Sequence, residues 1–355
     1  MFVTDCEGPI SKNDNAFELT THYVPNGAKL FTVISRYDDV LADLVKKSGY
    51  KAGDTLKLIL PFLKAYGVTS RKMRSFSASK LLLIADAKET LDHVKSIAPS
   101  FIVSTSYEHY IYALCQKTSF PYENTYSTKV NLEKYHVSEE EKRKLKRIAE
   151  EIAEMPILEI PFNAERLSDL SKQSQETIKR LDEIFWKEIA CTGCGRIFSE
   201  VNPVGGKEKA EALKDIAKKQ NAVFKEMMYV GDSITDQEAL ALVKANGGLA
   251  VSFNGNQYAI KNAEIAIMSK TSIATAIIAD LFIKEGKTLA MEIAENWNRE
   301  TLSKSPVDKL LLKRLLNLQS LPKVKIITSE NMESLAKSST EFRKTVRGEA
   351  IGRLG

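Results

Sequence analysis

The sequence predicts an α/β protein whose core is a parallel β-sheet with helices on both faces. Two short apolar segments, residues 1–4 and 227–230, have the composition of buried strands, and each is followed directly by acidic residues and glycine. Other apolar strand patterns alternate with amphipathic helix patterns, which is typical of βαβ units. Long stretches of helical periodicity interrupt this alternation. We therefore expect a three-layer core that carries helical insertions.

Three further strands are expected in this core. Residues 100–106 form an apolar run that ends in hydroxyl side chains, and residues 248–253 and 263–268 are also apolar and bounded by polar segments. Residues 87–94 and 208–220 have the amphipathic pattern of helices that connect such strands.

Two blocks of helical periodicity separate the core segments. In the second block, Ser138 and Glu141 form a capping-box pattern, and Asn163, after the break at Pro161, is expected to begin another helix. The expected division of the chain is as follows: core, residues 1–10, 81–131 and 199–270; helical cap, 11–80; helical insertion, 132–198; helical C-terminal region, 271–355.

The C-terminal region ends in a basic tail that contains Arg343, Lys344, Arg347 and Arg353. Chain ends of this composition are often disordered. A nucleic-acid binder that uses this tail is one possible interpretation, but the net charge of +5 is modest and is spread along the chain. We therefore expect no nucleic-acid partner.

Composition favours a cytoplasmic globular protein. The 355 residues are 43% hydrophobic, and no apolar run reaches the roughly 18 to 20 residues that span a bilayer. The N-terminus lacks the pattern of a signal peptide. Four cysteines are too few and too unevenly spaced for a disulfide framework in a chain of this size, which fits a reducing compartment.

Carboxylates follow two of the predicted strands. Asp5 and Glu7 follow the first strand, and Asp232 and Asp236 follow the strand at residues 227–230. Taken singly, an Asp beside Gly is typical of a turn. Together they indicate more, because ligands bind at the carboxyl ends of the strands in open parallel sheets. Clustered carboxylate oxygens at that edge suit a hard cation such as Mg²⁺.

Four elements occur in a characteristic order: residues 5–8, the strand that ends at Ser104, a lysine at position 207 or 209, and residues 231–236. In this order they resemble the haloacid dehalogenase superfamily of aspartate-nucleophile phosphohydrolases. The Asp-x-Glu-Gly form is similar to a branch near phosphoserine phosphatase, and an uncharacterised archaeal subfamily is an alternative. The resemblance implies a Rossmann-like three-layer core and leaves the helical blocks outside the match.

The resemblance also implies roles for the carboxylates. Asp5 would be the nucleophile that forms an aspartyl-phosphate. Mg²⁺ would be held by the side chain of Asp5, the backbone carbonyl of Glu7 and the side chain of Asp232, with Asp236 supporting this set of ligands. A cation is needed there because a carboxylate can attack a phosphate only when their mutual repulsion is offset.

Substrate-binding residues follow from the same resemblance. Ser104 and the adjacent Thr105 would bind phosphoryl oxygens, and a lysine would balance the negative charge of the nucleophile and the phosphoryl group. The spacing to the following leucine favours Lys209, although Lys207 remains possible. Asn254 lies in an Asn-Gly loop, which is typical of a tight turn but in the family faces the active site.

Glu7 departs from the family pattern, which usually has Asp at this position. A glutamate can protonate a leaving group and activate water with a side chain one methylene longer. The sequence therefore leaves open hydrolysis, transfer of the phosphoryl group to an alcohol acceptor, and a protein in which Glu7 points away. Pro9 replaces the Thr that is common in the family and removes a backbone donor.

Two insertions imply a covered pocket, because caps in this superfamily close over the active site. A closed pocket excludes polymers, so the expected substrate is a small phosphorylated metabolite. A noncatalytic accessory subunit of a larger complex, such as a hydrogenase-associated one, is the alternative from another functional class. A homo-oligomer or a protein partner is compatible with either function.

Overall fold

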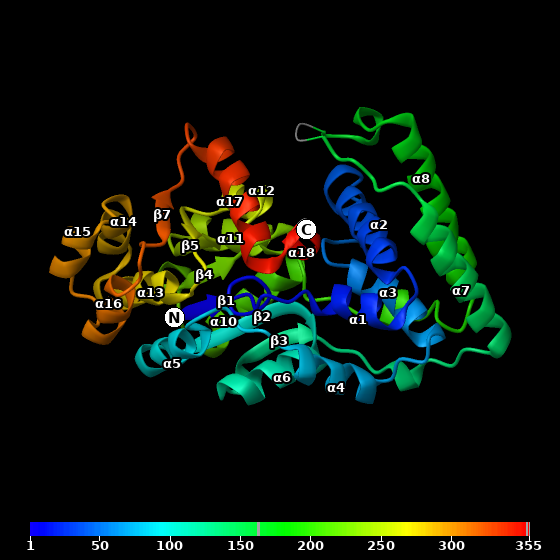
Figure 1. Cartoon of the computed structure of the whole chain (residues 1–355), viewed down its shortest axis with the longest axis horizontal. Coiled ribbons are helices and arrows are strands. Elements are labelled where there is room, and N and C mark those ends of the chain that lie inside the picture. Colours follow the sequence, from blue (N-terminus) through cyan, green and yellow to red (C-terminus); the bar gives the residue numbers. More distant parts are fainter. Residues whose placement is uncertain (162–163, 353, 355) are drawn as a thin grey trace.

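The computed structural model describes residues 1–161, 164–352 and 354. A β-sheet with helices on both faces forms one half of the molecule, and a body of helices forms the other half (Figure 1). The three-layer α/β fold predicted from the sequence is confirmed.

The sheet has seven strands in the order β3-β2-β1-β4-β5-β6-β7. All neighbours are parallel except β6 and β7. The strands are β1 Phe2–Thr4, β2 Ser100–Tyr107, β3 Thr125–Thr128, β4 Met228–Gly231, β5 Leu249–Phe253, β6 Ile265–Met268 and β7 Lys323–Ile326. Five of them match predicted strands, whereas β3 and β7 were not predicted.

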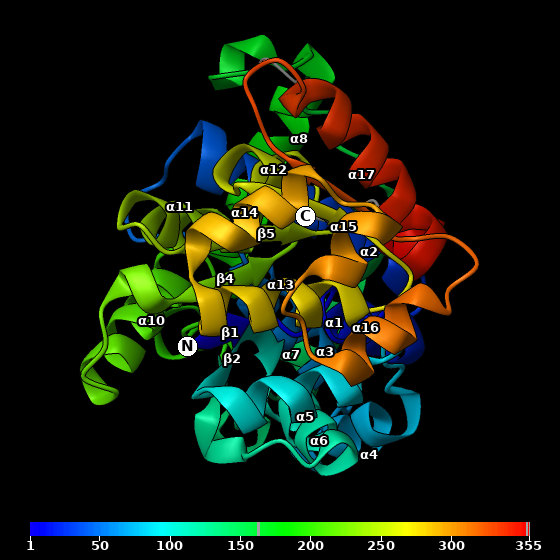
Figure 2. The same cartoon turned by 90° about the vertical axis from the view of Figure 1, so that its left-hand side faces the viewer.

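Alternate residues of each strand face opposite layers of the core. In β1, Phe2 packs into one apolar cluster and Val3 into the other. The layer on the Phe2 side includes α5 (Ala87–Ile97), α6 (Glu108–Thr118) and α13 (Ile273–Glu285) (Figure 2). The opposite layer includes α10 (Lys207–Lys219) and α11 (Gln237–Ala245), and α12 (Gln257–Asn262) follows β5.

The two helical blocks, far apart in sequence, share one apolar cluster, which we call the helical body. Its elements are α1 Asn15–Tyr23, α2 Gly27–Asp39, the π-helix η1 Val40–Leu44, α3 Thr55–Ala65, α4 Ser70–Lys80, α7 Glu139–Glu154, α8 Lys172–Glu183, the π-helix η5 Ile184–Ile189 and α9 Ile197–Glu200. The capping box of Ser138 and Glu141 is confirmed. The predicted helix start at Asn163 lies outside the described residues, and α8 begins at Lys172.

The C-terminal region contains α14 Lys287–Glu295, α15 Arg299–Lys304, α16 Lys309–Leu316, β7, α17 Met332–Arg347 and α18 Glu349–Gly352. This region, expected to be predominantly helical, thus also contains one strand, β7, that was not predicted. This short edge strand alternates two lysines with two apolar residues, and the lysines are exposed, as is usual for protected sheet edges. The basic tail forms helices as far as Gly352. Within the described part of the chain, no helix combines the length and apolarity needed to cross a membrane.

A buried carboxyl group in the helical body makes its stability sensitive to pH. Asp38 is buried and accepts a hydrogen bond of 2.9 Å from the amide of Gly53. Burial raises the pKa of Asp38 from 3.8 to about 7, and the nearby charges of Asp54 and Asp39 add to this effect. Tyr50 and the amide of Gly53 act in the opposite direction and lower the pKa of Asp38.

We expect the free energy of unfolding to fall as the pH rises from about 4 to about 8. The folded state retains the Asp38 proton up to a pH of about 7, whereas the unfolded state loses it near 4, so raising the pH favours the unfolded state. In Asp38→Asn, the change in the free energy of unfolding over this pH range should be smaller by a few kcal/mol at most, since one pKa unit corresponds to about 1.4 kcal/mol. Denaturant titrations at several pH values measure the free energy of unfolding. Asp215→Asn, at an exposed carboxylate, should keep the wild-type slope, and an unchanged slope in Asp38→Asn would contradict the assignment.

Candidate functional site

Asp5 and Asp232 lie at the carboxyl ends of two neighbouring parallel strands, β1 and β4. Thr4 pairs with Val230 in the sheet, and the amide of Asp5 donates to the carbonyl of Val230 at 2.8 Å. From β1 the chain continues to β2 and β3 on one side, and it then crosses to β4 on the other side. The two aspartates therefore lie at the point where the strand order reverses, which is where open α/β sheets bind ligands.

Three buried carboxylates converge at this point. Oxygens of Asp5, Asp232 and Asp236 lie within 4.8 Å of one another. Burial raises the pKa of Asp5 to about 7. The charges of Asp236 and Asp232 also raise this pKa, whereas Lys209 lowers it. Burial likewise raises the pKa of Asp232. Burial therefore disfavours the charged forms of Asp5 and Asp232, and the cationic side chains beside the cluster act in the opposite direction.

Lys209 supplies positive charge to this cluster. Its Nζ lies 2.7 Å from an oxygen of Asp5 and 2.7 Å from an oxygen of Asp236, and its side chain is fully buried. Lys207, the other lysine considered from the sequence, is exposed at the start of α10. The structure therefore brings Lys209 to the predicted nucleophile, because α10 presents Lys209 toward the end of β1.

Asp236 orients the site. One carboxylate oxygen accepts from Lys209 and from the hydroxyl of Tyr229 at 2.6 Å, and the other accepts from the amides of Asp232 and Ser233 at 2.9 and 3.0 Å. Although burial acts in the opposite direction, Lys209 and these hydrogen bonds lower the pKa of Asp236. Tyr229 was not predicted as a site residue, because it lies in β4, three residues before Asp232, and its sequence pattern is that of an ordinary core residue.

The donor set fits a hard divalent cation. Asp5 and Asp232 bring carboxylate oxygens together from adjacent strands, and oxygen ligands of this kind suit Mg²⁺. Asp236 already accepts five hydrogen bonds, so it fits a supporting position better than a direct ligand position. A cation between the first two carboxylates would offset the charge that raises the pKa of Asp5.

Gly8 allows the loop after β1 to approach Asp232 closely. Its φ is +109°, and a Cβ atom at this position would lie 2.1 Å from Oδ2 of Asp232. The preceding Glu7 lines the same cavity as Asp5, and its carboxylate accepts a hydrogen bond of 2.7 Å from the amide of Asn15 at the start of α1. Burial and the neighbouring Asp14 raise the pKa of Glu7 well above its usual value.

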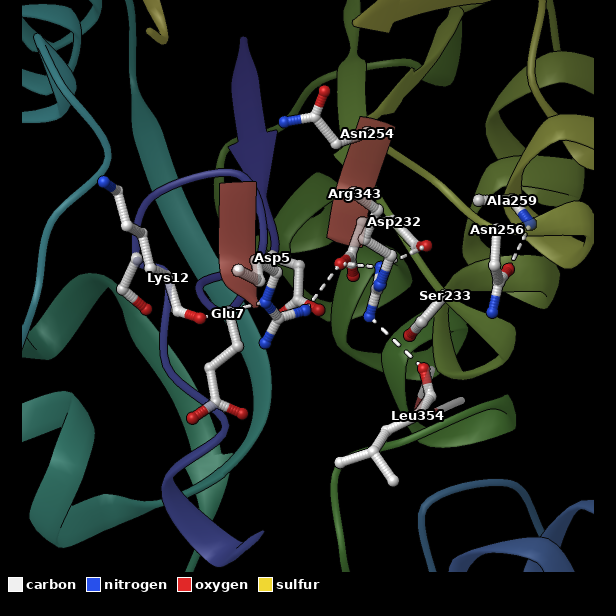
Figure 3. Close-up of polar contacts among 12 residues, drawn as sticks. Asp5, Glu7, Lys12, Asp232, Ser233, Asn254, Asn256, Ala259, Arg343 and Leu354 are labelled. Atoms are coloured by element: carbon white, nitrogen blue, oxygen red, sulfur yellow. Dashed lines mark hydrogen bonds and ion pairs between the residues drawn. The ribbon is translucent and has the colours of Figure 1, made fainter. Parts of the chain in front are cut away.

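Two of the predicted substrate-binding residues reach the cavity. Ser104 and Thr105, on β2, both line it, and the Ser104 hydroxyl donates to the hydroxyl of Ser106 at 3.1 Å. Asn254 is not among the described lining residues. Its side-chain amide forms hydrogen bonds of 2.8 and 2.9 Å with the backbone of Ser269, and Figure 3 shows it pointing away from Asp5.

The cavity has a volume of about 100 Å³ and lies between the carboxyl edge of the sheet and the helical body. The helical body contributes lining residues from α1, α2 and the start of α3, including Ala16, Phe31, Asp38, Asp39 and Thr55. The site is therefore formed jointly by the sheet and the helical body.

Two arginines of α17 also line this cavity, although the sequence indicated only that they belong to a basic tail. Arg343 and Arg347 both contact Oδ2 of Asp232, and the Arg343–Asp232 contact is visible in Figure 3. Their spacing of four residues was the only local signal, because it places both on one face of a helix. Nothing in the sequence indicated that this face meets a carboxylate more than a hundred residues away.

Comparison with known proteins agrees with this geometry. A family model described as haloacid dehalogenase-like hydrolase matches residues 76–278. A solved structure of a gene product from Archaeoglobus fulgidus matches with a TM-score of 0.81 and 29% sequence identity, covering 100% of this chain and 98% of that one. No curated protein matches the chain. Because the family model spans more than half of the chain and includes Ser104, Lys209 and Asp232, the chain belongs to the haloacid dehalogenase-like hydrolases.

Proposed function

We propose that the protein is a Mg²⁺-dependent phosphohydrolase that acts on a small phosphorylated metabolite through an aspartyl-phosphate at Asp5. The observation that carries the proposal is the position of Asp5, which lines the cavity with Ser104, pairs with Lys209 and faces Asp232 across two adjacent strands. Membership of the hydrolase family supports the same reaction class.

In the first step, a carboxylate oxygen of Asp5 attacks the phosphorus atom, and the bond from phosphorus to the ester oxygen breaks. Glu7, which lines the same cavity, gives its proton to the departing oxygen. In the second step, Glu7 takes a proton from a water molecule, whose oxygen displaces Asp5 from phosphorus and releases inorganic phosphate. The two steps together return Asp5 and Glu7 to their starting states.

Other residues hold the reacting groups in place. Lys209 fixes the Asp5 carboxylate through a contact of 2.7 Å, and Ser104 offers a hydroxyl to a phosphoryl oxygen. Asp5 and Asp232, with the Glu7 carbonyl, would hold Mg²⁺, and Asp236 would support them through its contacts with Lys209 and the Asp232 amide. The metal would offset the repulsion between the carboxylate and the phosphate.

The covered cavity favours a small substrate over a protein or nucleic acid. Its lining comes from the sheet edge and from the helical body, so the substrate must fit between them. A cap that excludes bulk water would also favour transfer to a bound alcohol, which keeps a phosphotransferase as the second candidate.

The test is a screen of phosphorylated metabolites with purified protein and Mg²⁺, in which both free phosphate and phosphate transferred to alcohols are measured. Turnover should require the metal and disappear with a chelator. Free phosphate without transferred product identifies a hydrolase, whereas a phosphorylated alcohol identifies a transferase. Complete inactivity across the screen would contradict the proposal and favour an accessory subunit.

Glu7→Gln should lower kcat by about 10²- to 10⁴-fold, because glutamine has the same shape but cannot give or take the proton. KM should change much less, since the side chain would still occupy its place beside Asn15. Steady-state kinetics on the substrate from the screen measures both. Glu140→Gln, on the exposed face of α7, is the matched control, and equal kcat values in the two variants would remove Glu7 from the mechanism.

A further inference from the structure

The C-terminal helix α17 brings two buried cations into the cavity. Arg343 is 3% exposed and Arg347 is 9% exposed, and both guanidinium groups contact Asp232. Both lie outside residues 76–278, the segment that the family model matches. Burying a cation is costly unless it is paired, so two buried arginines at one carboxylate indicate a specific role.

The charges of the cavity indicate what that role is. Arg343 and Arg347 are the only cationic side chains among the described lining residues. Lys209 is committed to Asp5 and Asp236 and is not part of that lining. Six lining side chains are acidic: Asp5, Glu7, Asp14, Asp38, Asp39 and Asp232. A phosphate dianion that enters this cavity therefore needs the two arginines as counter-charges.

The guanidinium groups are held in position and retain donor capacity. Arg347 donates from Nε to the carbonyl of Lys12 at 3.0 Å and from Nη2 to the carbonyl of Asn13. Arg343 donates to the carbonyl of Asp232 at 2.9 Å, while its buried Nε has no partner among the described residues. An unused, buried N–H of an arginine indicates a missing acceptor, and phosphate oxygens match the planar donor array of arginine.

The helix that carries these arginines is anchored to both halves of the molecule. Leu335 and Ala336 of α17 pack into a small apolar cluster with residues of α12 and β6. At the other end, Leu354 is buried in the apolar cluster of the helical body. Helix α18 thus lies between the two halves, as Figure 1 shows, and the two arginines line the cavity.

We propose that Arg343 and Arg347 form the phosphate-binding subsite of this site, which makes the C-terminal helix part of the substrate-binding machinery. The inference rests on the proposed function and extends it. A cation held by Asp5 and Asp232 would offset the charge of Asp232, and the two guanidinium groups would then be available to bind the non-bridging oxygens of the phosphoryl group. Arginine suits this task because it stays protonated and binds phosphate through two donors at once.

Calorimetric titration with inorganic phosphate, in the presence of Mg²⁺, tests the subsite directly. R343Q/R347Q should weaken phosphate binding by about tenfold or more, since hydrogen bonds to charged groups are each worth at least that factor. K304Q/K337Q is the matched control, because it removes two exposed charges from the same C-terminal region. It should bind phosphate as the wild type does. Equal affinity in R343Q/R347Q and the wild type would overturn the proposal, as would absence of phosphate binding by the wild type.

A measurement on the wild-type protein keeps the test independent of variant folding. Saturating phosphate should slow amide hydrogen exchange in α17, while α7 in the helical body should exchange at an unchanged rate. Bound phosphate with no change in α17 would overturn the proposal. Turnover of the wild type in the metabolite screen separates the subsite from the reaction. If the wild type binds phosphate through the two arginines but turns over no substrate, the subsite stands and the hydrolase is refuted. Turnover by the wild type that R343Q/R347Q leaves unchanged would refute the subsite and leave the hydrolase.

Discussion

Asp5→Asn should abolish phosphate release, lowering kcat by at least about 10³-fold, because an amide oxygen cannot act as the nucleophile. The change is nearly isosteric, and an Asn side-chain oxygen can still accept the hydrogen bond that the amide of Cys6 donates to Asp5 at 2.6 Å. The loss should therefore appear in kcat rather than in folding. Steady-state kinetics on the substrate from the screen, with far-ultraviolet circular dichroism as a check on folding, measures it.

A trapped intermediate gives the same prediction a second readout. Wild-type protein quenched in acid during turnover should carry one phosphoryl group on the peptide that contains Asp5, and Asp5→Asn should carry none. Asp92→Asn, at an exposed carboxylate on α5, controls for the loss of one negative charge and should keep full activity. Undiminished turnover in Asp5→Asn would rule out covalent catalysis at this residue.

Lys209→Met should produce the largest loss of stability, about 3 to 5 kcal/mol, as is typical when one partner of a buried ion pair is removed. Methionine has a similar volume, so the loss reports charge rather than a cavity. Without the ammonium group, the buried carboxylates of Asp5 and Asp236 lose their common counter-charge. Urea denaturation monitored by tryptophan fluorescence measures the difference, and activity should also be lost.

Lys207→Met is the matched control for this prediction. Lys207 lies two residues earlier on the same helix, and its side chain is exposed. Its replacement should change the free energy of unfolding by no more than about 0.5 kcal/mol, as is usual for surface positions. A comparable loss in both variants would show that the effect arises from helix α10 in general and not from the Lys209 contacts.

The sequence was sufficient for the segments whose signal is local. The strands before Asp5 and Asp232 are short apolar runs bounded by turn residues, and the capping box at Ser138 lies within four residues. Such patterns depend only on neighbouring residues, so they can be identified without knowledge of the fold. The choice of Lys209 over Lys207 also followed a local spacing, and the geometry places Lys209 beside Asp5.

Strands β3 and β7 were missed because their signals are weak. Each has four residues at or near an edge of the sheet, where polar side chains are tolerated, so neither shows a long apolar run. Their strand character depends on pairing with β2 and β6, which is a property of the assembled sheet. At Asn254 the sequence predicted the loop correctly but not the direction of the side chain. That direction depends on a hydrogen bond to Ser269, which is distant in sequence.

The sequence by itself determined the α/β class, the strands that carry Asp5 and Asp232, and the chemical types of the groups at their ends. Only the tertiary structure decided that the two helical blocks form one body and that Arg343 and Arg347 meet Asp232. The physical reason is the distance along the chain over which the deciding contacts act. Periodicity and capping depend on neighbours along the chain, whereas the position of α17 depends on apolar contacts at both of its ends with segments distant in sequence.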